Sequence, residues 1–315
     1  MLQVAQLDLL DTVESMATTH QNPGPVVLVL CGGGVYGAAQ AGMLEVLCES
    51  GFRPDVIVGV SAGALNGVFM AQDFTAARAR ELVLEWYASD SKELFPTKPA
   101  GQVLNLIRRR DALHAATGVR QTVARYAPDD LTSTQVPVFV GATSLKAGAT
   151  VWWSTGEALE RVCASTALPG IFPPVAIDGE LYVDGGVLCN VPVLKAVEMN
   201  ASKIVCLDMR QEDDEPDLQT SALAVLLRSF AVTRHELQRL HVSMVPPSVE
   251  LHHVVAHLPR LAPHDFSQSR ALAEAGRTAM SEYLERSSLR EAKRSEAAPL
   301  RRRTAREFLS RRVVV

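Results

Sequence analysis

Two short apolar runs constrain the fold of this chain most strongly, because each is followed directly by small residues and then by helical spacing. Residues 26–30 (VVLVL) form an uninterrupted run, and residues 55–60 (DVIVGV) contain a second, which begins after Asp55. Runs of this kind predict strands that are buried on both faces of a parallel sheet. Helical spacing follows over residues 36–50 and again from residue 62. The N-terminal part of the chain therefore predicts two successive strand–helix units.

The rest of the chain continues this alternation of strands and helices. A hairpin is predicted around residues 146–149, where two apolar runs flank a short polar turn. Further strands are expected at residues 136–143, 150–153, 181–183, 203–208 and 249–255, and further helices at residues 75–87, 157–165, 192–199, 221–241 and 268–286. The sequence thus predicts an α/β fold in which helices cover both faces of a mostly parallel sheet.

Changes in composition along the chain predict its domain organisation. Residues 1–24 are expected to form a leader segment, and residues 25–286 the folded domain. Within that domain, residues 90–130 combine apolar side chains with five arginines and predict two amphipathic helices, an insertion that lies over the sheet like a lid. Residues 287–315 form a basic tail that we expect to be flexible: from residue 286 onward, ten Lys and Arg stand against three Glu.

Composition excludes several classes of protein. The aromatic content of 5% and the formal net charge of −4 argue against a nucleic-acid-binding surface. The five cysteines form no CxxC pair and no cluster with histidine, so neither a zinc site nor a disulfide framework is predicted. The first residues lack the pattern of a signal peptide, and no stretch approaches the roughly 18 apolar residues of a membrane span. We therefore expect a soluble, cytoplasmic protein.

A glycine loop, residues 32–37 (GGGVYG), stands between the first predicted strand and its helix. Glycines allow the backbone to turn sharply, and the exposed N–H groups at a helix start can hold an anion. That anion is either a phosphate or the oxyanion of a tetrahedral intermediate. The same letters satisfy the dinucleotide-binding pattern G-x-G-x-x-G, which needs an acidic residue at the end of the second strand, whereas Asp55 stands at its start. A glycine turn without a ligand is a further alternative.

The second motif, Gly59-Val60-Ser61-Ala62-Gly63, is a G-x-S-x-G between the second strand and its helix. In a nucleophile elbow, small flanking residues permit a strained turn from which the serine hydroxyl projects. The N-terminus of the following helix favours negative charge that develops at that oxygen. Such letters also arise by chance, but their position between a strand and a helix favours Ser61 as a nucleophile.

Ser61 needs a base, and two kinds of residue are candidates. Among the histidines His264 is the best placed, although a surface or capping role suits it better than a catalytic one. A serine that follows only the second strand also fits the α/β-hydrolase topology poorly. The alternative is Asp184, which ends a short predicted strand and is followed by Gly185 and Gly186. A carboxylate with its ordinary pKa of about 4 is a poor base, but burial in a cleft raises that pKa. An Asp-Gly turn without a catalytic role has the same letters.

Taken in order, the glycine loop, the elbow and the Asp-Gly-Gly motif resemble the patatin-like phospholipase family. Smaller matches support this resemblance. They lie at Gly42 and at residues 61–66 (SAGALN), 164–174 (ASTALPGIFPP) and 190–192 (NVP). The resemblance extends from about residue 26 to residue 208 and more weakly to residue 283. It implies a three-layer α/β/α sandwich with a mostly parallel central sheet.

The resemblance also implies roles for individual residues. Ser61 would attack an ester carbonyl to form an acyl-enzyme, and Asp184 would accept the serine proton and later activate water. Backbone N–H groups near Gly33, Gly34 and Val35 would form the oxyanion hole, and neither a metal ion nor a cofactor would be required. The glycines that support these motifs are Gly32, Gly37, Gly59, Gly63, Gly185 and Gly186.

One position departs from the family pattern. The family usually has Arg or Lys two residues after the third glycine of the loop, where this chain has Tyr36. This departure leaves the Ser–Asp dyad intact and leaves the headgroup preference open.

The sequence as a whole predicts a serine acyl-ester hydrolase of the phospholipase A, lysophospholipase or esterase kind. Its expected partner is a fatty acyl ester or a phospholipid, with no nucleic acid. The insertion and the basic tail suit a peripheral contact with an anionic membrane, and a solvated charged face explains them equally well. Two other functions stay open: a nucleotide-binding protein that uses the glycine loop, and a catalytically idle binding protein on the same fold.

Overall fold

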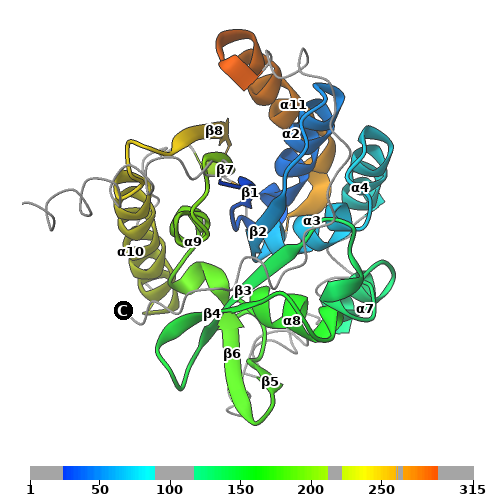
Figure 1. Ribbon diagram of the computed structural model, residues 1–315. Helices are drawn as coiled ribbons and strands as arrows, with labels where there is room; N and C mark the ends of the chain where they lie inside the picture. The colour runs from blue at the N-terminus through cyan, green and yellow to red at the C-terminus, as the bar shows by residue number, and fades with distance from the viewer. Residues whose placement is uncertain (1–23, 89–116, 212–221, 260, 262–264, 290–315) are drawn as a thin grey trace, which may run out of the picture.

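The computed structural model describes residues 24–88, 117–211, 222–259, 261 and 265–289, and in this part of the chain eight strands form a single sheet (Figure 1). The strands are β1 (Val26–Leu30), β2 (Val56–Val60), β3 (Val138–Ser144), β4 (Ala149–Trp153), β5 (Val175–Ile177), β6 (Glu180–Asp184), β7 (Lys203–Gln211) and β8 (Glu250–Leu258). The longer helices are α2 (Gly37–Glu49), α3 (Ala62–Ala71), α4 (Ala76–Ala88), α7 (Thr117–Ala124), α8 (Ala158–Ser165), α9 (Val193–Glu198), α10 (Ala222–Ser243) and α11 (Ser269–Arg286). The predicted strands and helices in the described residues are all confirmed, with ends that differ by at most three residues.

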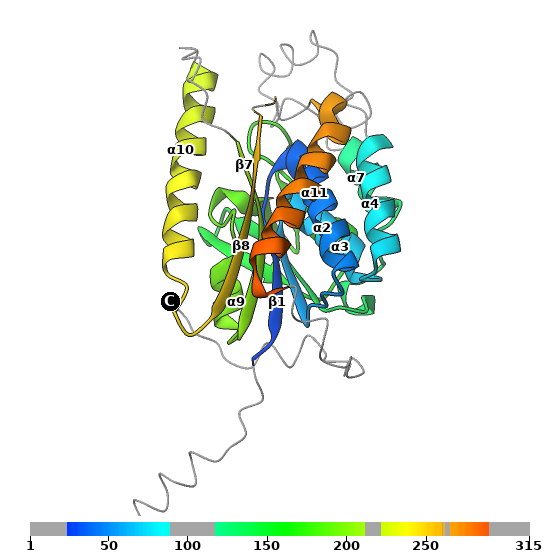
Figure 2. The same cartoon turned by 90° about the horizontal axis from the view of Figure 1, so that it is seen from above.

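The sheet lies between two layers of helices. Helices α2, α3, α4 and α11 cover one face, and α9 and α10 cover the other, as the second view shows (Figure 2). The hydrogen-bonded strand order is β5-β6-β3-β2-β1-β7-β8, with β4 also paired to β3. The predicted three-layer α/β/α fold is therefore confirmed.

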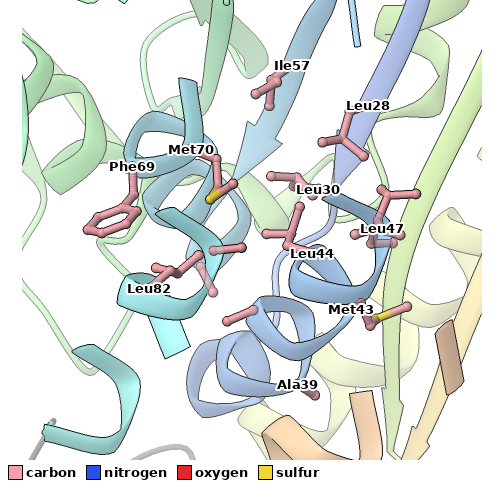
Figure 3. Packing of buried hydrophobic residues seen from close by; sticks show 14 of the residues in the cluster. Leu28, Leu30, Ala39, Met43, Leu44, Leu47, Ile57, Phe69, Met70 and Leu82 are labelled. Carbon is pink, nitrogen blue, oxygen red and sulfur yellow. The ribbon is translucent and has the colours of Figure 1, made fainter. Parts of the chain in front are cut away.

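Both faces of the central strands are buried, which explains why these strands are apolar without interruption. In β1, Leu28 and Leu30 belong to the core under α2 and α3, whereas Val27 and Val29 belong to the core under α9. Figure 3 shows Leu28 and Leu30 among the side chains that α2 and α3 contribute to the first of these cores. Side chains alternate between the two faces of a strand, so a strand in the middle layer needs an apolar residue at every position.

The sheet is parallel in its centre and antiparallel at one side. Strands β3, β2, β1, β7 and β8 pair in parallel, as predicted, but β4, β5 and β6 pair antiparallel. The short strand β5 was not predicted from the sequence. It forms a hairpin with β6 around Asp178 and Gly179, both of which have positive φ.

The pairing of β3 explains how two distant segments meet. One edge of β3 is occupied by β4, which pairs with residues 140–144. Two other strands pair with β3 as well: β2 with residues 138–141 and β6 with residues 142–144. These two strands must therefore share the other edge of β3. Strand β2 runs along that edge in the direction of β3, and β6 runs along it in the opposite direction. The carboxyl ends of β2 and β6 therefore point at each other, and the residues at those ends are brought together.

Several predicted segments lie outside the described residues. These are the leader segment, most of the lid-like insertion and nearly all of the basic tail, of which only residues 287–289 are described. From the insertion, α7 is described, and its Val123 is fully buried while Arg120 pairs with Glu160 of α8. None of the described helices combines the length and the apolar character that a membrane span requires.

Candidate active site

Ser61 occupies a sharp turn between the end of β2 and the start of α3. Its backbone has φ 53° and ψ −126°, a conformation that costs a non-glycine residue energy and that is typical of a nucleophile elbow. The flanking glycines make this turn possible. A Cβ atom on Gly59 would lie 2.4 Å from the carbonyl oxygen of Gly63, and one on Gly63 would lie 2.2 Å from that of Leu30.

The hydroxyl of Ser61 donates a hydrogen bond to Oδ2 of Asp184 at 2.7 Å. Asp184 is the last residue of β6, and its other carboxylate oxygen, Oδ1, accepts the N–H of Gly186 at 2.7 Å. The missing side chains at the next two positions also matter, because a Cβ atom on Gly185 would lie 2.3 Å from the carbonyl oxygen of Gly141. The structure thus brings together the two side chains that sequence analysis paired, with the carboxylate held at one oxygen and directed at Ser61 by the other.

The Asp184 carboxyl lies in an environment that favours proton uptake. Asp184 is 3% exposed, and this burial raises the pKa of its carboxyl to about 6, because the charged form loses contact with water. The hydrogen bonds from Ser61 and Gly186 and the positive charge of Arg234 oppose this rise in pKa. A carboxylate with a pKa of about 6 is a far better proton acceptor at neutral pH than an ordinary aspartate.

Ser165, at the end of α8, holds the backbone of the elbow in place. Its fully buried hydroxyl accepts the N–H of Ser61 at 2.9 Å and donates to the carbonyl oxygen of Gly141 at 2.6 Å. One hydroxyl thereby joins the elbow to β3, the strand against which both β2 and β6 pair. In the sequence, Ser165 belongs to the family-like run at residues 164–174, and no role was predicted for it.

The glycine loop faces the same site with free backbone donors. The N–H of Gly32 donates to the carbonyl oxygen of Asn190 at 3.0 Å, whereas within the described residues the N–H groups of Gly33, Gly34 and Val35 make no hydrogen bond. These three residues line one pocket together with Ser61. Gly34 has φ +56°, which favours glycine at this position.

A buried polar network supports the helix that follows the glycine loop. The side-chain amide of Asn66 donates to the carbonyl oxygen of Gly37 and to Gln40, both at 3.0 Å. The indole N–H of Trp86 completes the network by donating to the side-chain oxygen of Asn66 at 2.9 Å. The network connects α3, α2 and α4, so it fixes the loop relative to the elbow and to a wall of the pocket.

The pocket that contains Ser61 and Asp184 is mainly apolar. Its apolar lining comes from α3, α4, α7, the loop after α8 and the turn before α11. These residues are Leu65, Leu82, Trp86, Val119, Leu168, Ile171, Phe172 and Phe266. The polar residue Asn190 and the cation Arg234 lie at the same site. Arg234 was not predicted from the sequence, because it stands on a long helix without any motif.

The other candidates from the sequence that the structure describes do not reach this site. His264 lies outside the described residues, and no described histidine lines the pocket. His253 instead contacts Asp208 at 3.0 Å. Asp55, the acidic residue near the dinucleotide-like loop, accepts the N–H of Val26 at the far end of β1. Among the described residues no group of three His, Cys, Asp or Glu side chains is arranged to hold a metal ion.

Comparison with known proteins gives consistent matches. A family model for patatin-like phospholipases matches residues 28–197, more than half of the chain. The human patatin-like phospholipase domain-containing protein 6 is 30% identical over 198 residues, which cover 62% of this chain and 14% of the human protein. A Mycobacterium bovis protein described as an uncharacterized NTE family protein is 30% identical over 212 residues, 65% of this chain and 56% of that protein. The match is thus a small part of the human protein and little more than half of the mycobacterial one.

A solved structure also matches this chain. The crystal structure of VipD from Legionella pneumophila matches with a TM-score of 0.47 and 14% sequence identity, covering 84% of this chain and 67% of VipD.

Proposed function

Because the chain belongs to the patatin-like phospholipase family, we propose that it is a serine acyl-ester hydrolase that uses Ser61 and Asp184 as a catalytic dyad. The observation that carries this proposal is the 2.7 Å hydrogen bond from the Ser61 hydroxyl to Asp184 inside an apolar pocket. The glycine loop contributes backbone N–H donors to the same pocket. A nucleophile, a base and a set of oxyanion donors are the groups that acyl transfer needs.

In the first half of the reaction, Ser61 Oγ attacks the carbonyl carbon of the ester while its proton moves to Asp184 Oδ2. The carbonyl oxygen becomes an oxyanion, which the N–H groups of Gly33, Gly34 and Val35 stabilise. When this intermediate collapses, the bond to the alcohol oxygen breaks, and the alcohol leaves with the proton from Asp184. The product that remains is an acyl ester of Ser61.

In the second half, Asp184 acts again as a base, now on water. The water oxygen attacks the acyl carbon and gives its proton to Asp184, and a second oxyanion forms in the same place. Collapse breaks the bond to Ser61 Oγ, which takes the proton back, and the fatty acid leaves. A pKa of about 6 lets Asp184 both accept and return the proton near neutral pH.

The substrate that fits this pocket is an ester of an acyl chain. Leu65 and Leu82 lie on one side of it, and Leu168 and Phe172 on the loop after α8. An apolar lining of this kind stabilises a hydrocarbon chain by about 25 cal/mol for each Å² of apolar surface that is removed from water. The phospholipase A, lysophospholipase and esterase activities expected from the sequence all use such a chain.

The decisive experiment measures hydrolysis of a p-nitrophenyl acyl ester and labelling by a fluorophosphonate probe. Wild type should hydrolyse the ester and become labelled, Ser61→Ala should lose both, and Asp184→Asn should lose at least about 100-fold in kcat. Ser133→Ala, which changes an exposed serine outside the pocket, serves as the matched control and should behave as wild type.

Two results would contradict the proposal. If Ser61→Ala hydrolyses the ester at the wild-type rate, the serine is not the nucleophile. If the folded wild-type protein neither hydrolyses acyl esters nor reacts with the probe, the chain is a binding protein on this fold. Retention of the protein on a dinucleotide column would then point to the glycine loop as a nucleotide site.

A further inference from the structure

Arg234 reaches the pocket from the layer of helices opposite to the one that supplies most of its apolar lining. It stands on α10, whereas Leu65 and Leu82 stand on α3 and α4 across the sheet (Figure 2). Its guanidinium is close enough to Ser61's partner Asp184 for the two charges to interact. The pocket therefore has a mainly apolar side, at which Glu85 of α4 is also present, and an opposite side at which Arg234 supplies a cation, with Ser61 among its lining residues.

The guanidinium of Arg234 is partly buried and has no matching acceptor among the described residues. Within the described part of the chain it makes no hydrogen bond and no ion pair, and its only ring contact is with Phe230, at 6.0 Å from the ring centre. Burial lowers its pKa, and the carboxylates of Asp184 and Asp208 oppose that effect. A guanidinium has five N–H donors, and leaving them unpaired in a partly buried site is unfavourable.

The nearby carboxylates do not accept hydrogen bonds from these donors, although Oδ1 of Asp208 has no hydrogen-bond partner among the described residues. Asp184 is bonded to Ser61 and Gly186. Asp208 accepts Gln238 at 2.6 Å and contacts His253 at 3.0 Å. The donors of Arg234 are thus available to a ligand in the pocket.

The orientation of an acyl ester in this pocket follows from its two sides. Its hydrocarbon chain belongs among the apolar side chains of α3 and α4, and its carbonyl carbon belongs at Ser61. The alcohol portion then extends away from the apolar side, and among the described lining residues Arg234 is the cation that it can meet there. A guanidinium can donate two parallel hydrogen bonds to the oxygens of a phosphate, and the opposite charges strengthen both bonds. The hydroxyl groups of a neutral glycerol carry no charge, so they bind a guanidinium less strongly.

Resting on the proposed hydrolase function, we propose that Arg234 binds a phosphate group in the alcohol portion of the acyl ester. Arg234 is then the residue that makes the pocket select phosphate-bearing lipids over neutral glycerides. It touches the substrate and does not take part in proton transfer.

The experiment uses two ether lipids that cannot be hydrolysed, so that binding is measured independently of catalysis. These are 1-O-octylglycerol 3-phosphate and 1-O-octylglycerol, which differ only in the phosphate, titrated calorimetrically into the full chain. Arg234→Met should weaken binding of the phosphate lipid by about 10- to 100-fold, the effect of losing charge-assisted hydrogen bonds, and change the Kd of the neutral lipid by less than about threefold. Arg234→Lys should fall between wild type and Arg234→Met, because it keeps the charge without the fork.

Arg239→Met is the matched control on the same helix. Arg239 has a side chain that is 68% exposed and pairs with Glu236, and it does not line the pocket. The substitution Arg239→Met removes the same charge from α10, but at an exposed position outside the pocket. It should therefore leave the Kd of both lipids within about twofold of wild type. Circular dichroism of each variant checks that the chain is folded.

Several results would overturn the role of Arg234. In the first, Arg234→Met weakens binding of both lipids equally. In the second, wild type binds both lipids with equal affinity. In the third, Arg239→Met loses as much affinity for the phosphate lipid as Arg234→Met does. If Arg234→Met does not fold, Arg234→Lys decides the question by the same comparison. Arg234-dependent binding without hydrolysis of any acyl ester would instead contradict the hydrolase function and leave the phosphate site standing.

Discussion

The hydroxyl of Tyr36 accepts a hydrogen bond from the backbone N–H of Leu261 at 2.7 Å. The same hydroxyl donates to the carbonyl oxygen of Pro259 at 3.0 Å, so the segment after β8 is fastened to the glycine loop. Tyr36 is 3% exposed and is not among the residues that line the pocket. At the position where the family usually has a cation, this chain therefore has a buried residue that links two segments of backbone.

We expect Tyr36→Phe to destabilise the protein by about 1–2 kcal/mol, because two backbone groups lose their partner. Tyr36→Arg should cost more, since a guanidinium cannot accept the N–H of Leu261 and its charge would be buried. Urea unfolding measures both. Tyr87→Phe is the control, because among the described residues the Tyr87 hydroxyl has only a long contact, 3.4 Å from Arg277. This substitution should cost less than about 0.5 kcal/mol. Equal free energies of unfolding for Tyr36→Phe and wild type would show that the link carries no stability.

The central layer of the fold could be predicted because its information is local. The run at residues 26–30 is apolar at every position, as a strand between two helical layers requires, and the glycines that follow it mark the turn into α2. The elbow is equally local, since Gly59 and Gly63 stand next to the residue whose strained turn they permit.

The contacts that complete the site are not local, so the sequence could not predict them. Ser165 is 104 residues along the chain from Ser61, whose N–H donates a hydrogen bond to its hydroxyl. Nothing in the sequence around Ser165 distinguishes it from any other serine at a helix end. Arg234 is directed at the pocket by the way α10 packs, which the spacing of its residues does not determine. The antiparallel β6 was expected as a strand, but its direction depends on the path of β3 and β5.

Ser165→Ala should lower kcat about 10- to 100-fold with little change in KM. The substitution leaves the N–H of Ser61 and the carbonyl oxygen of Gly141 buried without their partner, so the elbow can move away from Asp184. Ser144→Ala is the control: Ser144 is equally buried and accepts the N–H of Ala147, but in the hairpin turn. It should reduce stability by a similar amount, about 1–3 kcal/mol, while kcat stays at the wild-type value. A wild-type kcat in Ser165→Ala would show that this hydroxyl has no part in positioning Ser61.

Gly63→Ala should prevent the elbow from forming. Its Cβ atom would lie 2.2 Å from the carbonyl oxygen of Leu30, and backbone on both sides of the contact would have to move. Gly67→Ala in the same helix is the matched control, because its nearest contact would be 3.2 Å from a methyl group of Ile57. We expect Gly63→Ala to lose activity and at least about 3 kcal/mol of stability, and Gly67→Ala to stay within about 1 kcal/mol of wild type, since alanine favours a helix. An active, stable Gly63→Ala would contradict the close packing of the elbow against β1.

The pH dependence of hydrolysis should follow the ionisation of Asp184. The carboxylate acts as a base, so its deprotonated form is the active one, and kcat/KM for a neutral acyl ester should rise with pH, reach half of its maximum near pH 6 and level off above pH 7. Below pH 6 the value should fall about tenfold per pH unit. Initial rates over pH 4.5–8.5 at constant ionic strength test this expectation. A half-maximum near pH 4 would mean that Asp184 is not desolvated in the free enzyme.

Burial of the Asp184 carboxylate should lower the stability of the protein at neutral pH. The folded state holds the proton up to a pKa of about 6, whereas an unfolded aspartate releases it near 3.9, so between these values the folded state binds more protons and stability falls as pH rises. Two pH units correspond to about 2–3 kcal/mol, fully expressed above pH 6 and absent below pH 4. Asp184→Asn removes the charge at nearly constant volume, so it should stabilise the protein by up to this amount at pH 7.5 and by almost nothing at pH 4. Urea unfolding at both pH values measures the difference, with Asp129→Asn, an exposed carboxylate, as the control. If Asp184→Asn is no more stable than wild type at pH 7.5, the desolvation that makes Asp184 a base is absent.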